Sequence, residues 1–379
     1  MRDKVGVRLH INSLKLINYR NYESLLVDFN KNINLILGKN GQGKTNIVES
    51  LTLMSIGKSF RTNRDKELIK FNCESLYAGC SFTRNGIDRK IEVVVTKDKK
   101  GIKVNGVSIK SIQELLGNLN VVVFSPEDLK LVKDGPRERR TFIDKEISQI
   151  MPRYYNLLTS YNKVLNQRNK LLKSRKVDTD LLYVYDSGLC EFGSEIYKIR
   201  LRFIDKLSRI SNELHKSLTS EKEDLTIKYK NQLNIEKETP IDEIKEKMLK
   251  KLEESREQDM FNGNTRIGPH RDDLGIYIND IDVRLYGSQG QQRTASISLK
   301  LSEIELIKIE LGDYPVLILD DVFSELDQNR QKMLVEKLKD IQMFVTSADP
   351  LHKNILERDD YSVFYIESGK VMKIENGGK

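Results

Sequence analysis

The sequence predicts an α/β protein in which the two ends of the chain form one domain and a mostly helical lobe is inserted between them. Three observations support this class. Short apolar runs alternate with turns before residue 130, a helical period takes over from Asp144, and strand and turn patterns return around Gly268. We therefore expect an α/β domain built from residues 1–143 and 267–379, and a basic helical lobe over residues 144–266.

The amino-terminal part contains the first group of expected strands. Each is a short apolar run, and Asn-Gly or Gly-rich turns separate several of them. The expected strands cover residues 14–17, 25–29, 33–37, 75–82, 91–96 and 121–124.

The middle of the chain has a helical pattern. Apolar and aromatic residues recur at intervals of three and four from Leu157 to Leu172, and the pattern continues over residues 189–218 and 241–260. After Gly268 a long helix is expected over residues 291–311, and an apolar strand follows over residues 315–319. The return to strands suggests that the carboxyl-terminal part completes the first domain.

Composition excludes several classes of protein. No apolar run approaches the roughly 18 residues of a membrane-spanning helix, and residues 1–16 lack the apolar centre of a secretory signal. The 3 cysteines and 4 histidines show no CxxC or HxxxH spacing, which argues against a disulfide framework and a structural zinc site. We expect a cytoplasmic protein without a membrane partner, and the net charge of +8 favours a polyanionic partner.

A phosphate-binding motif follows the third expected strand. It fits G-x-x-x-x-G-K-[ST] and reads Gly38-Lys39-Asn40-Gly41-Gln42-Gly43-Lys44-Thr45, with Asn46 opening a helix. Backbone N–H groups of such a loop surround phosphate oxygens, and the helix N-terminus adds a partial positive charge. Lys44 would contact the terminal phosphates of ATP and Thr45 would ligate Mg²⁺.

Two further motifs lie in the carboxyl-terminal part. The apolar strand ends in Asp320, expected to hold Mg²⁺ through water, and Asp321, expected to orient or deprotonate the attacking water. The run from Ser288 to Arg293 precedes the long helix and could form a second anion site or an ordinary N-cap. Ser324-Glu325-Leu326-Asp327 completes the set.

In this order the motifs resemble the head of an ABC-type ATPase, a fold of mixed sheets with helices. Within that class the chain is similar to the RecF family, which is related to SMC and Rad50 heads. The resemblance covers nearly the whole chain. Besides the motifs above, it is carried by Asn18-Tyr19-Arg20-Asn21-Tyr22, Phe124-Ser125-Pro126-Glu127-Asp128, Arg139-Arg140, Gly268-Pro269-His270-Arg271-Asp272-Asp273 and Tyr286-Gly287.

The resemblance implies roles for individual residues. Lys44, Asp320 and Asp321 would act in ATP hydrolysis, with Thr45 and Asp320 at the Mg²⁺. In a homodimer joined by ATP, the second subunit would supply Ser288, Gly290 and Gln291 to the γ-phosphate and Asp327 to the interface. Arg20 is similar to an arginine that contacts nucleotide in related heads, and Glu127 falls near the Q-loop position.

Three departures from the general ABC pattern suggest a slow hydrolase whose ATP cycle acts as a timer, and we expect a weak, DNA-stimulated ATPase that acts as a switch. Gln289 replaces the first of two signature glycines, Asp321 stands where a glutamate is usual, and Ser347 occupies the place of the switch histidine. All three positions bear on the rate of hydrolysis, and none argues against ATP binding.

The helical lobe is the expected DNA-binding part of the chain. Residues 151–230 contain 16 Lys and Arg against 10 Asp and Glu, and residues 161–176 contain no acid. Lysine and arginine side chains give sequence-independent, salt-dependent contacts to phosphates, although a solvated helix face has the same composition. The candidates are Lys163, Arg168, Lys170, Lys173, Arg175 and Lys176.

The resemblance implies an ATP-dependent DNA-binding protein of recombinational gap repair, DNA replication and SOS induction. It would clamp double-stranded or gapped DNA, with single-stranded DNA as an alternative, and help RecO and RecR to load RecA. Two alternatives remain open, an ATP-binding subunit of a membrane transporter and a DNA scaffold with a silent nucleotide site. An SMC-type arm protein is disfavoured because residues 144–268 are too few for a long coiled coil.

Overall fold

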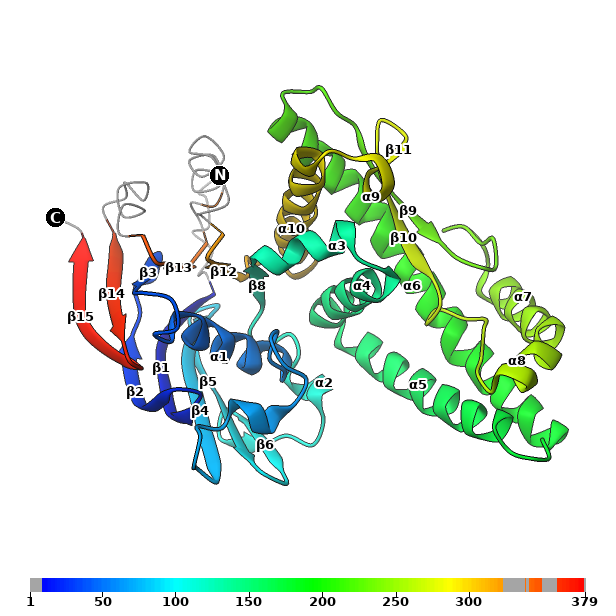
Figure 1. The fold of residues 1–379 in the computed structure, drawn as a ribbon, viewed down its shortest axis with the longest axis horizontal. Coiled ribbons are helices and arrows are strands. Elements are labelled where there is room, and N and C mark those ends of the chain that lie inside the picture. Colours follow the sequence, from blue (N-terminus) through cyan, green and yellow to red (C-terminus); the bar gives the residue numbers. More distant parts are fainter. Residues whose placement is uncertain (1–8, 323–337, 339–340, 350–359, 378–379) are drawn as a thin grey trace. The chain divides into compact units, whose positions relative to one another are not determined.

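The computed structural model describes residues 9–322, 338, 341–349 and 360–377, coloured along the chain in Figure 1. The chain divides into two compact units, Met1–Asp128 with Ile307–Lys379, and Leu129–Leu306. The expected boundaries after residues 143 and 266 both fall inside the second unit. The signature loop at Ser288, expected in the α/β domain, also belongs to that unit.

Among the described residues the first unit contains two six-stranded sheets. The first sheet is antiparallel and has the order β2-β1-β4-β5-β6-β7. Its strands are β1 (His10–Tyr19), β2 (Tyr22–Asp28), β4 (Ser75–Arg84), β5 (Ile87–Thr96), β6 (Lys100–Val104) and β7 (Val107–Ser108). Buried and exposed residues alternate from Ser24 to Asp28 in β2, as expected for a sheet with one face on the core.

The second sheet has the order β15-β14-β3-β13-β12-β8 and is parallel except for the edge strand β15. Its strands are β3 (Ile33–Leu37), β8 (Val121–Phe124), β12 (Val316–Asp320), β13 (Met343–Ser347), β14 (Tyr361–Glu367) and β15 (Lys370–Gly377). Every residue of β3, β8, β12 and β13 is buried, which matches their predominantly apolar sequences. Parallel pairing brings the carboxyl ends of β3, β12 and β13 to one edge.

Helix α1 (Lys44–Ile56) leaves the carboxyl end of β3 and contacts strands of both sheets (Figure 1). Its apolar side chains belong to the core cluster of this unit, and most of its residues are buried on all sides, which suits a helix between two sheets. The other short elements of the unit are η1 (Asp65–Leu68) and α2 (Ile112–Leu115), and η2 (Pro126–Leu129) follows β8 at the unit boundary.

The second unit is mostly helical and has its own core. Its helices are α3 (Lys130–Lys133), α4 (Pro136–Ile150), α5 (Pro152–Leu172), α6 (Thr179–Thr219), α7 (Ile241–Glu254), α8 (Arg256–Asn262) and α9 (Val283–Tyr286). Helix α10 (Gln289–Leu311) begins here and ends in the first unit. A three-stranded antiparallel sheet, β11-β10-β9, packs with α6 and contains β9 (Leu225–Lys230), β10 (Asp273–Ile278) and β11 (Ile281–Asp282).

Within the described part of the chain, no helix combines the length and the apolar character needed to cross a lipid bilayer.

Candidate functional site

The phosphate loop connects β3 to α1 through backbone conformations that favour glycine. Gly41 has φ +81° and Gly43 has φ +114°, and a Cβ atom on Gly43 would lie 2.7 Å from the Asn21 side chain. Gly38 is equally constrained, because a Cβ there would collide with the backbone of Ile366. The motif glycines are therefore required by geometry, and the loop ends at the N-terminus of α1.

Lys44 is the first residue of α1, and its side chain folds back over the loop. Its Nζ donates to the Gly38 carbonyl at 2.9 Å and the Lys39 carbonyl at 3.3 Å, and lies 3.4 Å from Oδ1 of Asn40. Only 4% of Lys44 is exposed. A buried ammonium group with neutral acceptors is well placed to bind an anion that enters the loop.

Asp320 lies at the carboxyl end of β12 and receives two threonine hydroxyls on one oxygen. Thr45 Oγ1 donates to Oδ1 of Asp320 at 3.0 Å, and Thr346 Oγ1 donates to the same atom at 2.7 Å. Burial raises the pKa of Asp320 above its usual value, and these two hydrogen bonds oppose that rise. A hydroxyl beside a carboxylate at the end of a phosphate loop is a suitable oxygen set for Mg²⁺.

Asp321 follows with φ +55°, a left-handed conformation that is uncommon for a residue with a side chain. Its backbone N–H donates to Thr346 Oγ1 at 3.1 Å. Thr346 therefore holds both Asp320 and Asp321 in place. Thr346 was not predicted as a site residue, because only the pairing of β12 with β13 brings it opposite Asp320.

Asn46 and Arg20, two residues expected to contact the nucleotide, have protein partners near the loop. Asn21 donates from Nδ2 to the Gln42 carbonyl at 2.9 Å and accepts from Asn46 Nδ2 at 2.8 Å, so it links the loop to α1. Arg20 donates from Nε and Nη2 to the carboxylate of Glu49, at 2.9 and 2.6 Å. Arg20 thus lies in the same unit as the loop, with its guanidinium ion-paired to α1.

The signature residues lie at the start of α10 in the second unit, where Ser288 and Gly290 are exposed. The Gln291 N–H donates to Ser288 Oγ at 3.2 Å, and the Ser288 N–H donates to Gln291 Oε1 at 3.0 Å, so the pair forms a reciprocal helix cap. A serine hydroxyl that accepts from the backbone retains its own hydrogen to donate to an anion.

The cap is tied to the core by polar contacts that sequence reasoning missed. Gln291 Nε2 donates to Glu223 Oε1 at 2.9 Å, and Glu223 Oε2 lies 3.1 Å from His215 Nε2. On its other side, His215 Nδ1 lies 3.0 Å from Ser298 Oγ on α10. These partners are distant in sequence, so no local pattern could have revealed them.

Most of the expected DNA-binding residues are exposed on α5 and the turn after it. These are Lys163, Lys170, Lys173, Arg175 and Lys176. Asp327, expected at the dimer interface, lies outside the described residues.

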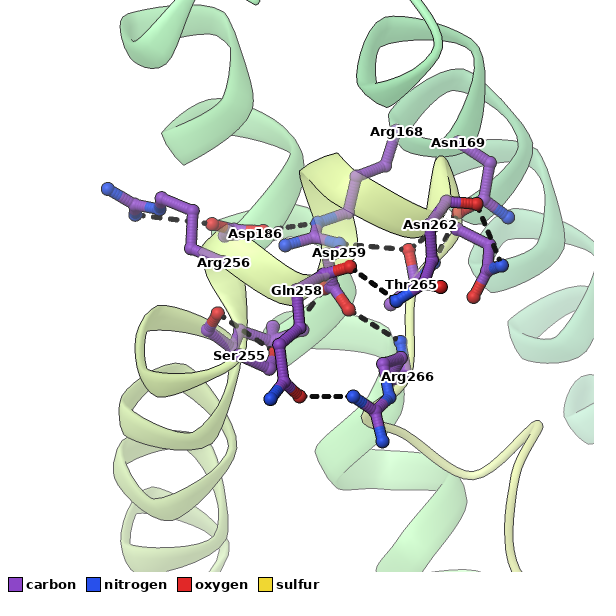
Figure 2. Close-up of polar contacts among 12 residues, drawn as sticks. Arg168, Asn169, Asp186, Ser255, Arg256, Gln258, Asp259, Asn262, Thr265 and Arg266 are labelled. Carbon is purple, nitrogen blue, oxygen red and sulfur yellow. Dashed lines mark hydrogen bonds and ion pairs between the residues drawn. The ribbon is translucent and has the colours of Figure 1, made fainter.

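The expectation that Arg168 contacts DNA is wrong. Its side chain is fully buried and ion-paired with two carboxylates, Asp186 at 2.6 Å and Asp259 at 2.7 Å, as the dashed lines of Figure 2 mark. A buried arginine between two carboxylates is a structural connection. The sequence already contained the signal, since Arg168 lies on the apolar stripe of the helix with Tyr161 and Leu165, which are also buried.

The phosphate loop after β3, the carboxylate at the end of β12 in the same parallel sheet and the signature cap define the head of an ABC-type ATPase. The profile of the RecF/RecN/SMC N terminal domain matches residues 10–370. DNA replication and repair protein RecF of Clostridioides difficile (strain 630) is 58% identical over 370 residues, covering 98% of this chain and all of the relative. The chain belongs to the RecF family of DNA replication and repair proteins, as the sequence analysis expected.

Further relatives and solved structures support the assignment to the RecF family. DNA replication and repair protein RecF of Alkaliphilus oremlandii (strain OhILAs) is 47% identical over 362 residues, covering 95% of this chain and 99% of the relative. Among solved structures, the recombination mediator protein RecF-ATP in the RecFOR pathway matches with a TM-score of 0.91 and 36% identity, covering 99% of this chain and 100% of that chain. The Smc head domain of Pyrococcus furiosus, at 16% identity, 98% and 96% coverage and a TM-score of 0.55, shares the fold. The expected fold class is confirmed.

Proposed function

We propose that this protein binds ATP and Mg²⁺ in its first unit and uses the nucleotide to join two copies of the chain on DNA during recombinational repair. The observation that supports this most directly is the convergence of Thr45 and Thr346 on Asp320, beside the buried ammonium of Lys44. Asp320 and Thr346 lie at the carboxyl ends of β12 and β13, and Lys44 and Thr45 begin α1 after the loop that follows β3. This edge of a parallel sheet is where ligands bind.

Each residue of the site has a separate task in this proposal. The loop from Gly38 to Gly43 surrounds the phosphates with N–H groups, and Lys44 exchanges its carbonyl contacts for phosphate oxygens. Thr45 and Asp320 would hold Mg²⁺, which neutralises phosphate charge when bound. Asp321 would orient the attacking water or accept its proton.

The second unit would act on the nucleotide of the partner copy. Ser288 would donate its hydroxyl hydrogen to the γ-phosphate, with Gly290 and Gln291 contributing from the same cap, and Asp327 would lie at the interface. ATP would then act as a bridge between two chains. Because Asp321 has a shorter side chain than glutamate, we expect slow hydrolysis that serves to release the dimer.

DNA is the proposed partner of the dimer, at double-stranded sites next to gaps. The exposed cations of α5 and the following turn would supply phosphate contacts. Structures of related proteins place RecF in the RecFOR pathway, so we propose RecO and RecR as partners in loading RecA, in the cytoplasm.

The decisive experiment compares the Lys44→Met variant with a matched surface variant, Lys97→Met, whose lysine is 60% exposed and paired with Glu74. Affinity for a fluorescent ATP analogue and sedimentation with and without ATP–Mg²⁺ are measured for both. We expect Lys44→Met to lose at least about tenfold in ATP affinity and to remain monomeric, because a charge-assisted phosphate contact is lost. Wild-type dimerisation of Lys44→Met with ATP would contradict the proposal.

A further inference from the structure

A polar cavity lies in the second unit beyond the carboxyl end of α8. Its volume is about 560 Å³, and the residues that line it are Gln232, Asn262, Asn264, Arg266 and Arg271. Every lining residue carries an amide or a guanidinium group, so hydrogen-bond donors predominate. None of these described lining residues is aromatic or acidic, which disfavours a stacked base or a cation as the ligand.

Both arginines of the cavity bond to neutral groups. Arg271 donates from Nε and Nη2 to the Thr265 carbonyl, at 3.1 and 3.0 Å, and from Nη2 to Asn264 Oδ1 at 3.0 Å. Arg266 donates from Nη1 to the Gln258 amide oxygen, a contact drawn in Figure 2. Both arginines are exposed. Their contacts are to uncharged acceptors, so their positive charges are available to an external anion.

Two buried carboxylates in the cluster around Arg168, Asp186 on α6 and Asp259 on α8, are balanced by arginines that do not line the cavity. Arg168 pairs with Asp186 and Asp259, and Arg256 lies 3.5 Å from the second oxygen of Asp186. Two arginines thus balance two aspartates in this cluster, whose contacts Figure 2 shows. The charges of Arg266 and Arg271 are additional to this balance.

The same buried cluster fixes the loop that carries the cavity. Arg168 Nη1 donates to Thr265 Oγ1 at 3.0 Å, and Asn169 Oδ1 accepts from the Thr265 N–H at 2.7 Å. The Arg266 N–H donates to Asp259 Oδ1 at 3.1 Å. The backbone that presents the two cavity arginines is therefore held by side chains of α5 and α8, which preorganises the site.

The loop that carries the cavity residues lies against Lys173, at the end of the basic stretch of α5. A Cβ atom on Gly263 would lie 2.9 Å from the Lys173 side chain, so the stem of Lys173 packs against the loop between Asn262 and Asn264. Lys173 itself is exposed. A polyanion that follows the cations of α5 would reach the cavity at this point.

We infer that this cavity binds a phosphodiester group of the DNA backbone, with Arg266 and Arg271 as its charged ligands and the three amides as additional donors. The inference rests on the proposed DNA-binding function and assigns a particular site to it. A guanidinium group matches the geometry of phosphate oxygens, and contacts of this kind fix the position of DNA without reading its sequence.

The test measures binding of a fluorescent blunt duplex DNA at several salt concentrations in the presence of ATP–Mg²⁺. Arg266→Gln and Arg271→Gln are each expected to lower affinity about 3- to 10-fold and to reduce the slope of log affinity against log salt by about 1. Arg266→Lys keeps the charge and should retain most of the slope. Asn262→Asp adds a negative charge beside both arginines and should weaken binding without removing either.

Arg209→Gln is the matched control, because Arg209 is 67% exposed and lies about 34 Å along α6 from Asp186. It should bind DNA like the wild type. If Arg271→Gln lowers the melting temperature, Arg266→Gln and Asn262→Asp test whether the cavity binds DNA. Arg266→Gln should leave the fold intact, since the Arg266 side chain bonds only to the exposed amide of Gln258 among the contacts described.

Two failures can be told apart. Wild-type protein that does not bind the duplex would overturn the proposed DNA-binding function and this inference with it. Wild-type protein that binds, together with Arg266→Gln and Asn262→Asp variants of unchanged affinity and salt slope, would overturn only the assignment of the cavity.

Discussion

At the scale of single residues, Thr346 is the side chain that connects the two site carboxylates. Replacing it by valine keeps the shape, removes one hydrogen bond to Asp320 and leaves the Asp321 N–H without its acceptor. Because the Thr346 hydrogen bond lowers the pKa of Asp320, its loss should raise that pKa further and weaken the carboxylate as a metal ligand. We predict about a tenfold loss in Mg²⁺-dependent ATP affinity, measured by titration at fixed Mg²⁺.

Thr52→Val provides the control for this change. Thr52 is also a buried threonine of the first unit, but its hydroxyl donates to the Val48 carbonyl within α1, at 3.3 Å. Thr52→Val should change the free energy of unfolding slightly and leave the Mg²⁺ dependence of ATP affinity like that of the wild type. Equal Mg²⁺ dependence in the two valine variants would contradict the role assigned to Thr346.

His270 gives a second prediction at this scale. It lies between Tyr161, whose hydroxyl is 2.7 Å from Nδ1, and the Thr265 carbonyl, 3.1 Å from Nε2. Burial, followed by repulsion from nearby arginines, lowers the pKa of His270 to about 4, although the Thr265 carbonyl opposes the change. The folded state therefore prefers the neutral ring, which contributes stability above the ordinary histidine pKa of about 6.5.

That contribution is lost as the pH falls from about 6.5 toward 4, because the unfolded chain takes up the proton first. His270→Gln keeps a donor and an acceptor but cannot titrate. We predict that the advantage of the wild type over this variant in free energy of unfolding shrinks by at most about 1.4 kcal/mol per pH unit in this window. Urea unfolding followed by circular dichroism at several pH values measures it. A difference independent of pH would refute the buried neutral histidine.

Some site residues could be predicted from the sequence and others could not. The phosphate loop was predictable because its geometry depends on eight consecutive residues and a strand before them. Thr346 was not, because its role arises from the register of β12 with β13, in which it lies opposite Asp320. Arg168 was wrongly predicted to bind DNA, because the prediction relied on its charge and ignored its position on the apolar stripe of α5.

At the scale of elements, Arg168 connects three helices of the second unit. It belongs to α5 and pairs with Asp186 on α6 and Asp259 on α8. Removing the guanidinium leaves two buried carboxylates with reduced compensation, so Arg168→Met should lower the free energy of unfolding by about 3–5 kcal/mol. The matched variant Lys170→Met changes an exposed cation of the same helix and should stay within about 0.5 kcal/mol.

Chemical denaturation measures both variants, and DNA binding is measured at a temperature where both are folded. If Arg168→Met were as stable as the wild type and merely bound DNA less well, Arg168 would be a DNA ligand after all. The structure predicts that Arg168→Met loses much of its stability and that its affinity for DNA changes less, and only indirectly.

Helices and strands with strong local patterns were predicted well. The expected strand 33–37 coincides with β3, and the expected helix 291–311 lies within α10. The strand β9 was missed although its six residues alternate between apolar and polar, because it is short, it follows a long helical pattern, and its partner β10 begins more than forty residues later. A pairing across that distance leaves little trace in local composition.

At the scale of the whole molecule, the phosphate loop and the signature cap belong to different compact units of one chain. The sequence predicted that both chain ends share one domain, and the first unit combines residues before Asp128 with residues after Ile307. Motif order could not reveal that Ser288 belongs to the other unit. In the proposed dimer, each ATP would contact the loop of one chain and the signature cap of its partner.

This arrangement predicts complementation between two inactive variants. Lys44→Met impairs the loop and keeps the cap, whereas Ser288→Arg keeps the loop but places a bulky cation in the cap. Each variant alone should remain monomeric with ATP–Mg²⁺, and Ser288→Arg should still bind ATP. A mixture can form a heterodimer in which the intact loop of one chain meets the intact cap of the other, so one of the two sites is complete.

Sedimentation velocity of the mixture should therefore reveal an ATP-dependent dimer, weaker than that of the wild type because only one site bridges the chains. The dimer should dissociate when Mg²⁺ is removed, because the nucleotide that joins the two chains is expected to bind together with Mg²⁺. If Ser288→Arg alone dimerised like the wild type, the cap would not act on the partner's ATP. If the mixture stayed monomeric while the wild type dimerised, a single complete site would be insufficient, and closure would require both nucleotides together.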